Sequence, residues 1–239
     1  MLNNKIILRR LYSTMKLPFY LLLALLFIQT AVIAQSTKEE RQQDREDHDV
    51  RNKITMGFKL GLNYANGFDW SSAKFVANSF VGLATGTFIS IPLSTTIGLQ
   101  PELLFSQKGF RSDGLLNGQS YSVTRTTNYF DLPLQVAFKP LKGITILVGP
   151  QYTYLIRQTD DFKSGPYTTQ QALAFEQATV KRNTVSLLVG VDLTLRHLVL
   201  STKAGMDLHQ NIGDGPPQTQ RYNYLWLQAC VGYRFYNNR

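Results

Sequence analysis

The sequence has little of what disulfide formation, metal binding and hydrolytic catalysis require. It contains one cysteine, Cys230, so no disulfide can form within the chain, and only three histidines. No GxSxG or HExxH motif occurs and no cluster of ligands has metal-binding spacing, so we expect neither a metal site nor a cofactor. The formal net charge is +9, but no basic and aromatic platform accompanies it, which argues against a nucleic-acid partner.

The N-terminal residues have the features of a secretory signal peptide. Basic residues precede the apolar run LPFYLLLALLFIQTAVIA (17–34), and Ala34-Gln35 offers a small-residue cleavage point. An uncleaved membrane anchor is the alternative, although Pro18, Gln29 and Thr30 interrupt the run. We therefore expect residues 1–34 to be an export signal.

The segment that follows is almost entirely polar. Residues 35–53, QSTKEERQQDREDHDVRNK, carry charges of both signs and almost no apolar side chains. Such a segment cannot bury enough apolar surface to fold by itself. We predict a disordered, charged tail, with a partner-binding arm as the alternative.

From residue 54 onward, apolar residues recur with a period of two, the pattern of a β-strand with two unlike faces. In ITILVGPQYTYLI (144–156), Ile146 and Val148 share one face, and Thr145 and Thr153 share the other. The pattern predicts eight strands: 54–64, 81–91, 97–106, 130–139, 144–156, 185–196, 198–208 and 225–235. An even number of such strands is typical of bacterial outer-membrane barrels.

The connections between these strands alternate in length. Long connections of roughly 13 to 25 residues alternate with turns of about two to four, which places all the long loops at one end of a barrel. Of the long connections, 158–182 is where we expect a binding function to lie. Pro101 and Pro150 fall inside predicted strands, and we interpret them as bulge or register-kink positions.

Aromatic residues lie near both ends of the apolar face. They are Tyr64, Phe105, Phe130, Tyr152, Tyr154, Tyr222 and Tyr224 at the end with the long loops, and Phe138, Tyr233, Phe235 and Tyr236 at the other. Two aromatic girdles around an aliphatic band indicate a face turned toward lipid. We therefore predict that residues 54–239 form an all-β domain, an eight-stranded antiparallel up-and-down transmembrane barrel in the outer membrane. Residues 35–53 would then be a periplasmic tail. A secreted soluble barrel that binds a ligand is the alternative.

The opposite face carries charges in the middle of several strands and would line the lumen. The predicted lumenal polar network consists of Lys59, Glu102, Asp131, Lys139, Arg157, Asp192, Lys203, Asp207 and Arg234. Eight strands enclose a lumen that side chains can fill, and charges inside it must pair or keep water. Four acids against five bases favour a structural plug, with an ion or proton path as the alternative.

Enzymatic activity is the other function class to consider. Ser106, Asp207 and His209 share the lumenal face near the outer strand ends, where some outer-membrane enzymes that modify lipid A hold a Ser/His set. No His and Ser lie two apart on one strand, and no catalytic motif is present. We therefore predict no catalytic residues and a structural or interaction role.

Five sequence blocks resemble one family of outer-membrane barrels. These blocks are GFKLGLNYA (57–65), LQPELLFSQKGF (99–110), YFDLPLQVAFKP (129–140), LVGPQYTYLI (147–156) and VGYRF (231–235). They resemble the PorT type of outer-membrane β-barrel protein, common in Bacteroidetes, over about residues 54–239. The family usually has tyrosine at the position of Phe105 and glutamate at that of Asp131. The resemblance implies a barrel in the outer membrane, with outer-membrane lipid and an envelope or secretion-machinery protein as partners.

Overall fold

The computed structural model describes residues 50–68, 77–116, 119–163, 182–209 and 223–235. A short 3-10 helix, η1 (Val50–Asn52), precedes eight strands. The strands are β1 (Thr55–Phe68), β2 (Ala77–Pro92), β3 (Ile97–Leu116), β4 (Gln119–Leu141), β5 (Ile144–Lys163), β6 (Asn183–Leu195), β7 (Leu198–Asp207) and β8 (Asn223–Phe235). The predicted signal peptide (1–34) and most of the predicted tail lie outside the described residues.

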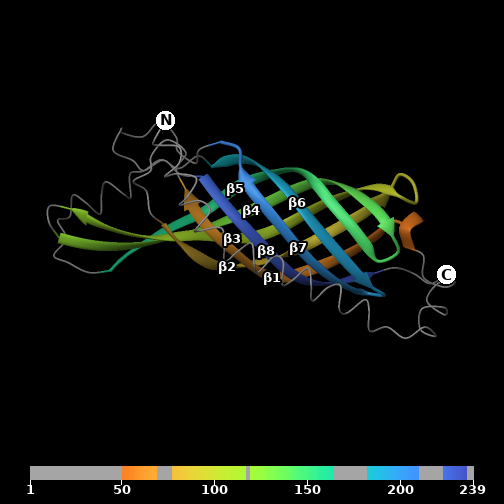
Figure 1. The fold of residues 1–239 in the computed structure, drawn as a ribbon, viewed down its shortest axis with the longest axis horizontal. Helices are drawn as coiled ribbons and strands as arrows, with labels where there is room; N and C mark the ends of the chain where they lie inside the picture. The colour runs from red at the N-terminus through yellow and green to blue at the C-terminus, as the bar shows by residue number, and fades with distance from the viewer. Residues whose placement is uncertain (1–49, 69–76, 117–118, 164–181, 210–222, 236–239) are drawn as a thin grey trace, which may run out of the picture.

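The eight strands form a closed barrel in which every strand pairs with its neighbours in the chain (Figure 1). All pairings are antiparallel, and β1 pairs with β8 from Met56↔Phe235 to Phe68↔Asn223 to close the circle. The prediction of an eight-stranded up-and-down barrel is therefore confirmed. Among the described residues, no helix has both the length and the apolar character needed to cross a membrane.

Exposure alternates along the strands as the period of two predicts. On β5, Tyr152 is 42% exposed whereas the preceding Gln151 is 2% exposed, and on β4 Leu134 is 55% exposed whereas Gln135 is fully buried. The apolar residues thus lie outside and the polar residues inside, the reverse of a water-soluble protein. A continuous band of exposed aliphatic side chains is stable only against lipid.

Three short connections lie together at one end of the barrel. Lys142-Gly143 joins β4 to β5 and Arg196-His197 joins β6 to β7, while residues 93–96 join β2 to β3. Gly143 has a φ of +82°, which glycine adopts without strain, whereas Arg196 has a φ of +53°. The helix η1 lies at this same end, where Lys139 Nζ donates a hydrogen bond to the Arg51 carbonyl at 3.3 Å.

The opposite end differs from the prediction. The segment expected to be a loop between the third and fourth strands is a long hairpin, paired from Ile97↔Phe138 to Leu116↔Gln119. Strand β5 also continues to Lys163, so residues 158–163 of the expected loop 158–182 are strand, and 164–181 lie outside the described residues. In Figure 1 the hairpin of β3 and β4 projects well beyond the barrel. Its polar residues resemble a loop in composition, because both faces of a strand outside the membrane can be polar.

The interpretation of the two strand prolines is wrong. Pro101 pairs with Leu134 and Pro150 pairs with Leu187, and the register is the same on both sides of each pair. A register shift occurs instead between β4 and β5, where Asn128 pairs with Arg157 but Tyr129 pairs with Leu155. Ile156 is thus an extra residue in β5, a one-residue bulge.

Candidate functional site

The lumen holds eight of the nine residues predicted to form its polar network. Lys59, Glu102, Asp131, Lys139, Asp192, Lys203, Asp207 and Arg234 are all buried, none more than 5% exposed. Arg157 is exposed on the outer surface instead. The bulge at Ile156 is the reason, because one extra residue reverses the face on which every later side chain of the strand lies.

Four of these residues form an ionic cluster in the lumen. Lys59 Nζ lies 3.1 Å from Glu102 Oε1 and 2.8 Å from Asp192 Oδ2. Lys203 Nζ pairs with the other carboxylate oxygen of Glu102. The four side chains come from β1, β3, β6 and β7, so the cluster crosses the lumen. We call Lys59, Glu102, Asp192 and Lys203 the lumenal quartet.

Neutral side chains complete the hydrogen bonding of the lumenal quartet. Gln100 Nε2 donates to both Glu102 Oε1 and Asp192 Oδ2 at 3.0 Å. The Ser201 hydroxyl donates to Asp192 Oδ1. Two positive and two negative charges therefore lie together with further hydrogen bonds, which is the condition under which buried charges are tolerated.

A second ion pair lies in the same lumen and was missed in the sequence. Lys108 Nζ lies 3.1 Å from Asp131 Oδ2 and 3.7 Å from the centre of the Trp226 ring. Arg125 is also buried, over the ring of Phe110. Lys108 and Arg125 lie beyond the bounds predicted for the third and fourth strands, although the alternation through Leu104, Ser106 and Lys108 marks the continuing strand.

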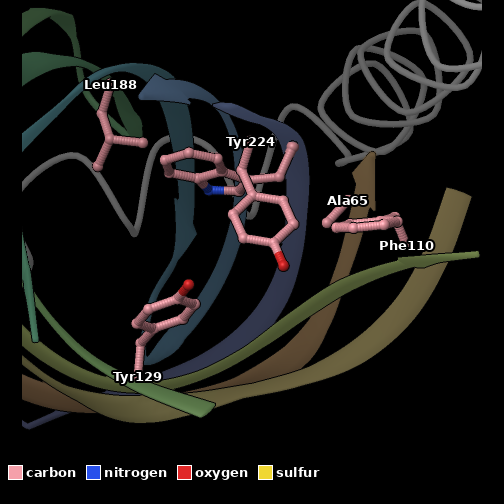
Figure 2. Close-up of a cluster of buried hydrophobic side chains, with 6 residues drawn as sticks. Ala65, Phe110, Tyr129, Leu188 and Tyr224 are labelled. Atoms are coloured by element: carbon pink, nitrogen blue, oxygen red, sulfur yellow. The ribbon is translucent and has the colours of Figure 1, made fainter. Parts of the chain in front are cut away.

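Aromatic side chains fill the lumen near the end with the projecting hairpin. The buried cluster consists of Ala65, Phe110, Tyr129, Leu188, Tyr224 and Trp226. Figure 2 shows these side chains pointing into the barrel, with Tyr129 and Tyr224 near one another. The two tyrosine rings pack edge to face, with their centroids 6.3 Å apart. The Tyr224 hydroxyl and Thr127 Oγ1 share a hydrogen bond of 3.0 Å. Tyr224 therefore belongs to the lumen and not to the outer aromatic girdle where it was predicted.

The bulky lumenal side chains lie opposite glycines on the neighbouring strand. Lys59 pairs with Gly232, Lys203 with Gly190, Trp226 with Gly205 and Phe88 with Gly57. A Cβ atom at Gly190 would lie 2.6 Å from Lys203 Cγ, and one at Gly57 would lie 2.6 Å from Phe88 Cε1. Because a contact of that length is repulsive, these glycines provide the space in which the large side chains lie across the lumen.

The three residues considered for catalysis have separate environments. Ser106 Oγ accepts a hydrogen bond from Asn63 Nδ2 at 2.8 Å. Asp207 accepts one from Ser186 Oγ at 2.7 Å and one from the Tyr224 amide at 3.0 Å. His209 is exposed. Among the described residues, no group of three or more His, Cys, Asp or Glu side chains could hold a metal ion.

A closed antiparallel barrel that is apolar outside and ion-paired inside defines the class of transmembrane β-barrels. The chain belongs to the family described as outer membrane protein beta-barrel domain, whose model matches residues 33–213. The protein is accordingly an integral protein of the outer membrane.

Solved structures of several outer-membrane proteins are similar to the chain. A major outer membrane protein from Thermus thermophilus is 17% identical, with a TM-score of 0.44, covering 77% of this chain and 100% of that one. The attachment invasion locus protein Ail of Yersinia pestis is 9% identical, with a TM-score of 0.41, covering 76% and 98%. OprG from Pseudomonas aeruginosa is 12% identical, with a TM-score of 0.40, covering 77% and 95%. No curated protein matches the chain significantly.

Proposed function

We propose that the protein is a non-conducting barrel of the outer membrane with a structural or interaction role, whose projecting strands β3, β4 and β5 face the cell exterior. The observation that carries this proposal is the filled lumen. The lumenal quartet crosses it in one region, and the Lys108–Asp131 pair and the aromatic cluster occupy it nearer the projecting end. Side chains thus occupy successive levels of a barrel that is already narrow.

The orientation follows from the two unlike ends. Short turns at the periplasmic end and longer extensions at the outer end are the rule in bacterial outer-membrane barrels. We infer that Lys142 and Arg196 face the periplasm, together with η1 and a charged tail over residues 35–53, after removal of residues 1–34 as an export signal. The hydrogen bond from Lys139 to Arg51 would hold the end of that tail at the periplasmic mouth.

The interaction role rests on the projecting hairpin. Arg111 is exposed on this hairpin, and Asp161 is exposed on the neighbouring strand β5. The resemblance to PorT-type proteins suggests an accessory role in secretion or envelope assembly, with a protein of that machinery as partner. Lipid A modification is a weaker candidate, since Ser106 and Asp207 are hydrogen-bonded to different residues.

Single-channel recording in planar bilayers tests the proposal that the lumen is closed. We expect the purified protein to insert without producing stable conductance steps, because ions meet the lumenal quartet and the aromatic cluster in turn. The matched variant is Tyr224→Ala, which opens space at the outer end but leaves the quartet in place, and it should also be silent. Regular conductance steps from the wild-type protein would contradict a filled barrel.

Cross-linking in intact cells tests the interaction role. A photo-reactive residue at Arg111, on the projecting hairpin, should give a discrete protein adduct, whereas one at the lipid-facing Val148 should not. Equal adducts at both positions, or none at Arg111, would contradict a partner at the projecting end.

A further inference from the structure

We propose that the acidic end of the N-terminal tail, residues 39–49, docks on a group of basic residues at the mouth of the barrel that carries the short turns. Residues 39–49 precede the described part of the chain. The inference goes beyond the proposed function, because this contact lies within one chain and does not depend on the direction in which the barrel crosses the membrane. The charge of the mouth, the charge of the tail and the point at which the tail leaves the barrel each support it.

The described charged side chains at this end of the barrel are basic. They are Arg51, Lys53, Lys139, Lys142, Arg196 and Arg234, and we call these residues the basic mouth. Lys53, Lys142 and Arg196 are exposed, whereas Lys139 and Arg234 line the lumen. Among the described residues, the acids nearest to this end are Glu102 and Asp192. Both belong to the lumenal quartet, whose charges balance, so the mouth has a net positive charge.

Hydrogen bonds join the elements that carry these charges into one rim. The Thr194 amide donates to the Gly143 carbonyl at 2.7 Å, which joins β6 to the turn between β4 and β5. The Arg234 amide donates to the His197 carbonyl at 2.7 Å, which joins β8 to the turn between β6 and β7. Charges of one sign around a single rim produce a potential that attracts a segment of the opposite charge.

The tail has that opposite charge. The segment EERQQDREDHD (39–49) contains six acidic and two basic residues, so its formal charge is −4. Its last four residues include Glu46, Asp47 and Asp49 and no lysine or arginine. The segment contains no apolar side chain that could bind by burial, so ionic contacts are the interaction available to it.

The helix η1 delivers this segment to the mouth. Although η1 precedes β1, the Arg51 carbonyl accepts a hydrogen bond at 3.3 Å from Lys139 on β4, three strands further around the barrel. Figure 1 shows η1 at the end with the short turns. Glu46 is five residues before Arg51, so even an extended chain keeps it within about 18 Å of this hydrogen bond. A tether this short gives an effective concentration on the order of millimolar, at which weak ionic contacts are sufficient.

Double electron–electron resonance between two nitroxide labels tests the contact. In the full chain with Cys230→Ala, His48→Cys labels the acidic segment without removing an acid, and Thr95→Cys labels an exposed position in the turn between β2 and β3. The protein is measured in nanodiscs of phosphatidylethanolamine and phosphatidylglycerol. We expect a narrow distance distribution at about 0.1 M salt and a broad one at about 1 M, because the screening length falls from about 10 Å to about 3 Å.

Reversal of charge tests whether the acids and the basic mouth recognise one another. Glu46→Lys with Asp47→Lys, which leaves the barrel unchanged, should broaden the distribution at low salt. Lys142→Glu with Arg196→Glu should do the same, and the four changes together should restore the narrow distribution. Arg111→Glu, on the projecting hairpin, is the matched control and should have no effect.

A broad distribution at low salt in the unmodified tail would overturn the inference, as would a narrow one that survives either charge reversal. An equal broadening in Arg111→Glu would also overturn it, because net charge alone would then explain the result. A distribution that is narrow in neutral detergent but broad in the nanodiscs would show that phospholipid headgroups occupy the basic mouth instead of the tail. None of these results depends on the orientation of the barrel, which labelling in cells tests separately.

Discussion

Glu102 receives ion pairs from two lysines that are far apart in the sequence, Lys59 on β1 and Lys203 on β7. These contacts, with that between Lys59 and Asp192, link strands that are not neighbours in the sheet. Removing one partner of a buried ionic group leaves an uncompensated charge, which costs more than replacing the pair by neutral side chains. The lumenal quartet therefore contributes to the choice of register as well as to the filling of the lumen.

Replacing one lysine of the quartet should destabilise the barrel strongly. We expect Lys203→Met to lower the free energy of unfolding by about 3–5 kcal/mol, because the buried quartet would keep an uncompensated negative charge. Adding Glu102→Gln should restore a large part of that loss by removing the excess charge. Urea titration in lipid vesicles, followed by the gel shift of the folded form, measures both. Lys142→Met, in an exposed turn, is the control, and a double variant no more stable than Lys203→Met would contradict the pairing.

A methyl group added at Gly205 should be costly. A Cβ atom there would overlap the Trp226 ring and lie 2.5 Å from Leu188 Cδ2. We expect Gly205→Ala to destabilise the protein by about 1–3 kcal/mol, the usual range for overpacking. Ala204→Val enlarges the residue that precedes Gly205 and faces lipid, so it should change the stability little. The same urea titration compares the two, and similar stabilities would mean that the glycine is not needed for packing.

Strand β5 shows how the depth of a residue in the membrane determines the effect of a new charge on folding stability. Val148 and Thr159 both lie on its outward face and are exposed, but Val148 lies within the aliphatic band, whereas Thr159 lies beyond the exposed aromatic pair Phe130 and Tyr154. We expect Val148→Arg to cost about 2–4 kcal/mol of folding free energy in vesicles, and Thr159→Arg to cost about 0–1 kcal/mol. Equal costs at both positions would contradict a lipid boundary between Tyr154 and Arg157.

The period of two was sufficient to predict the eight strands, and it assigned most side chains of the regular stretches to the correct face. It failed where regularity ends. The bulge at Ile156 adds one residue, which leaves no mark in composition, so Arg157 was placed on the wrong face. Lys108 and Arg125 were missed because polar strand residues outside the lipid resemble a loop. Which acid pairs with which base depends on the closure of the barrel, and alternation along one strand does not contain that information.

At the scale of the whole molecule, the two ends of the barrel differ. One end has three short turns, and there Lys139 donates a hydrogen bond to η1. The other end has the aromatic cluster inside and the projecting hairpin outside (Figure 1). The proposed interaction role places the functional surfaces at these two ends, so the direction in which the barrel crosses the membrane determines which partners each end can contact.

Cysteine labelling in cells should reveal that direction. In a Cys230→Ala background, which removes the one native cysteine, Asp161→Cys places a thiol on the projecting end and Lys142→Cys places one in a short turn. Both native side chains are exposed. We expect a membrane-impermeant maleimide to label Asp161→Cys on intact cells, and to label Lys142→Cys only after the outer membrane is permeabilised. Labelling after permeabilisation confirms that each thiol can react. The opposite pattern would mean that the short turns face the exterior.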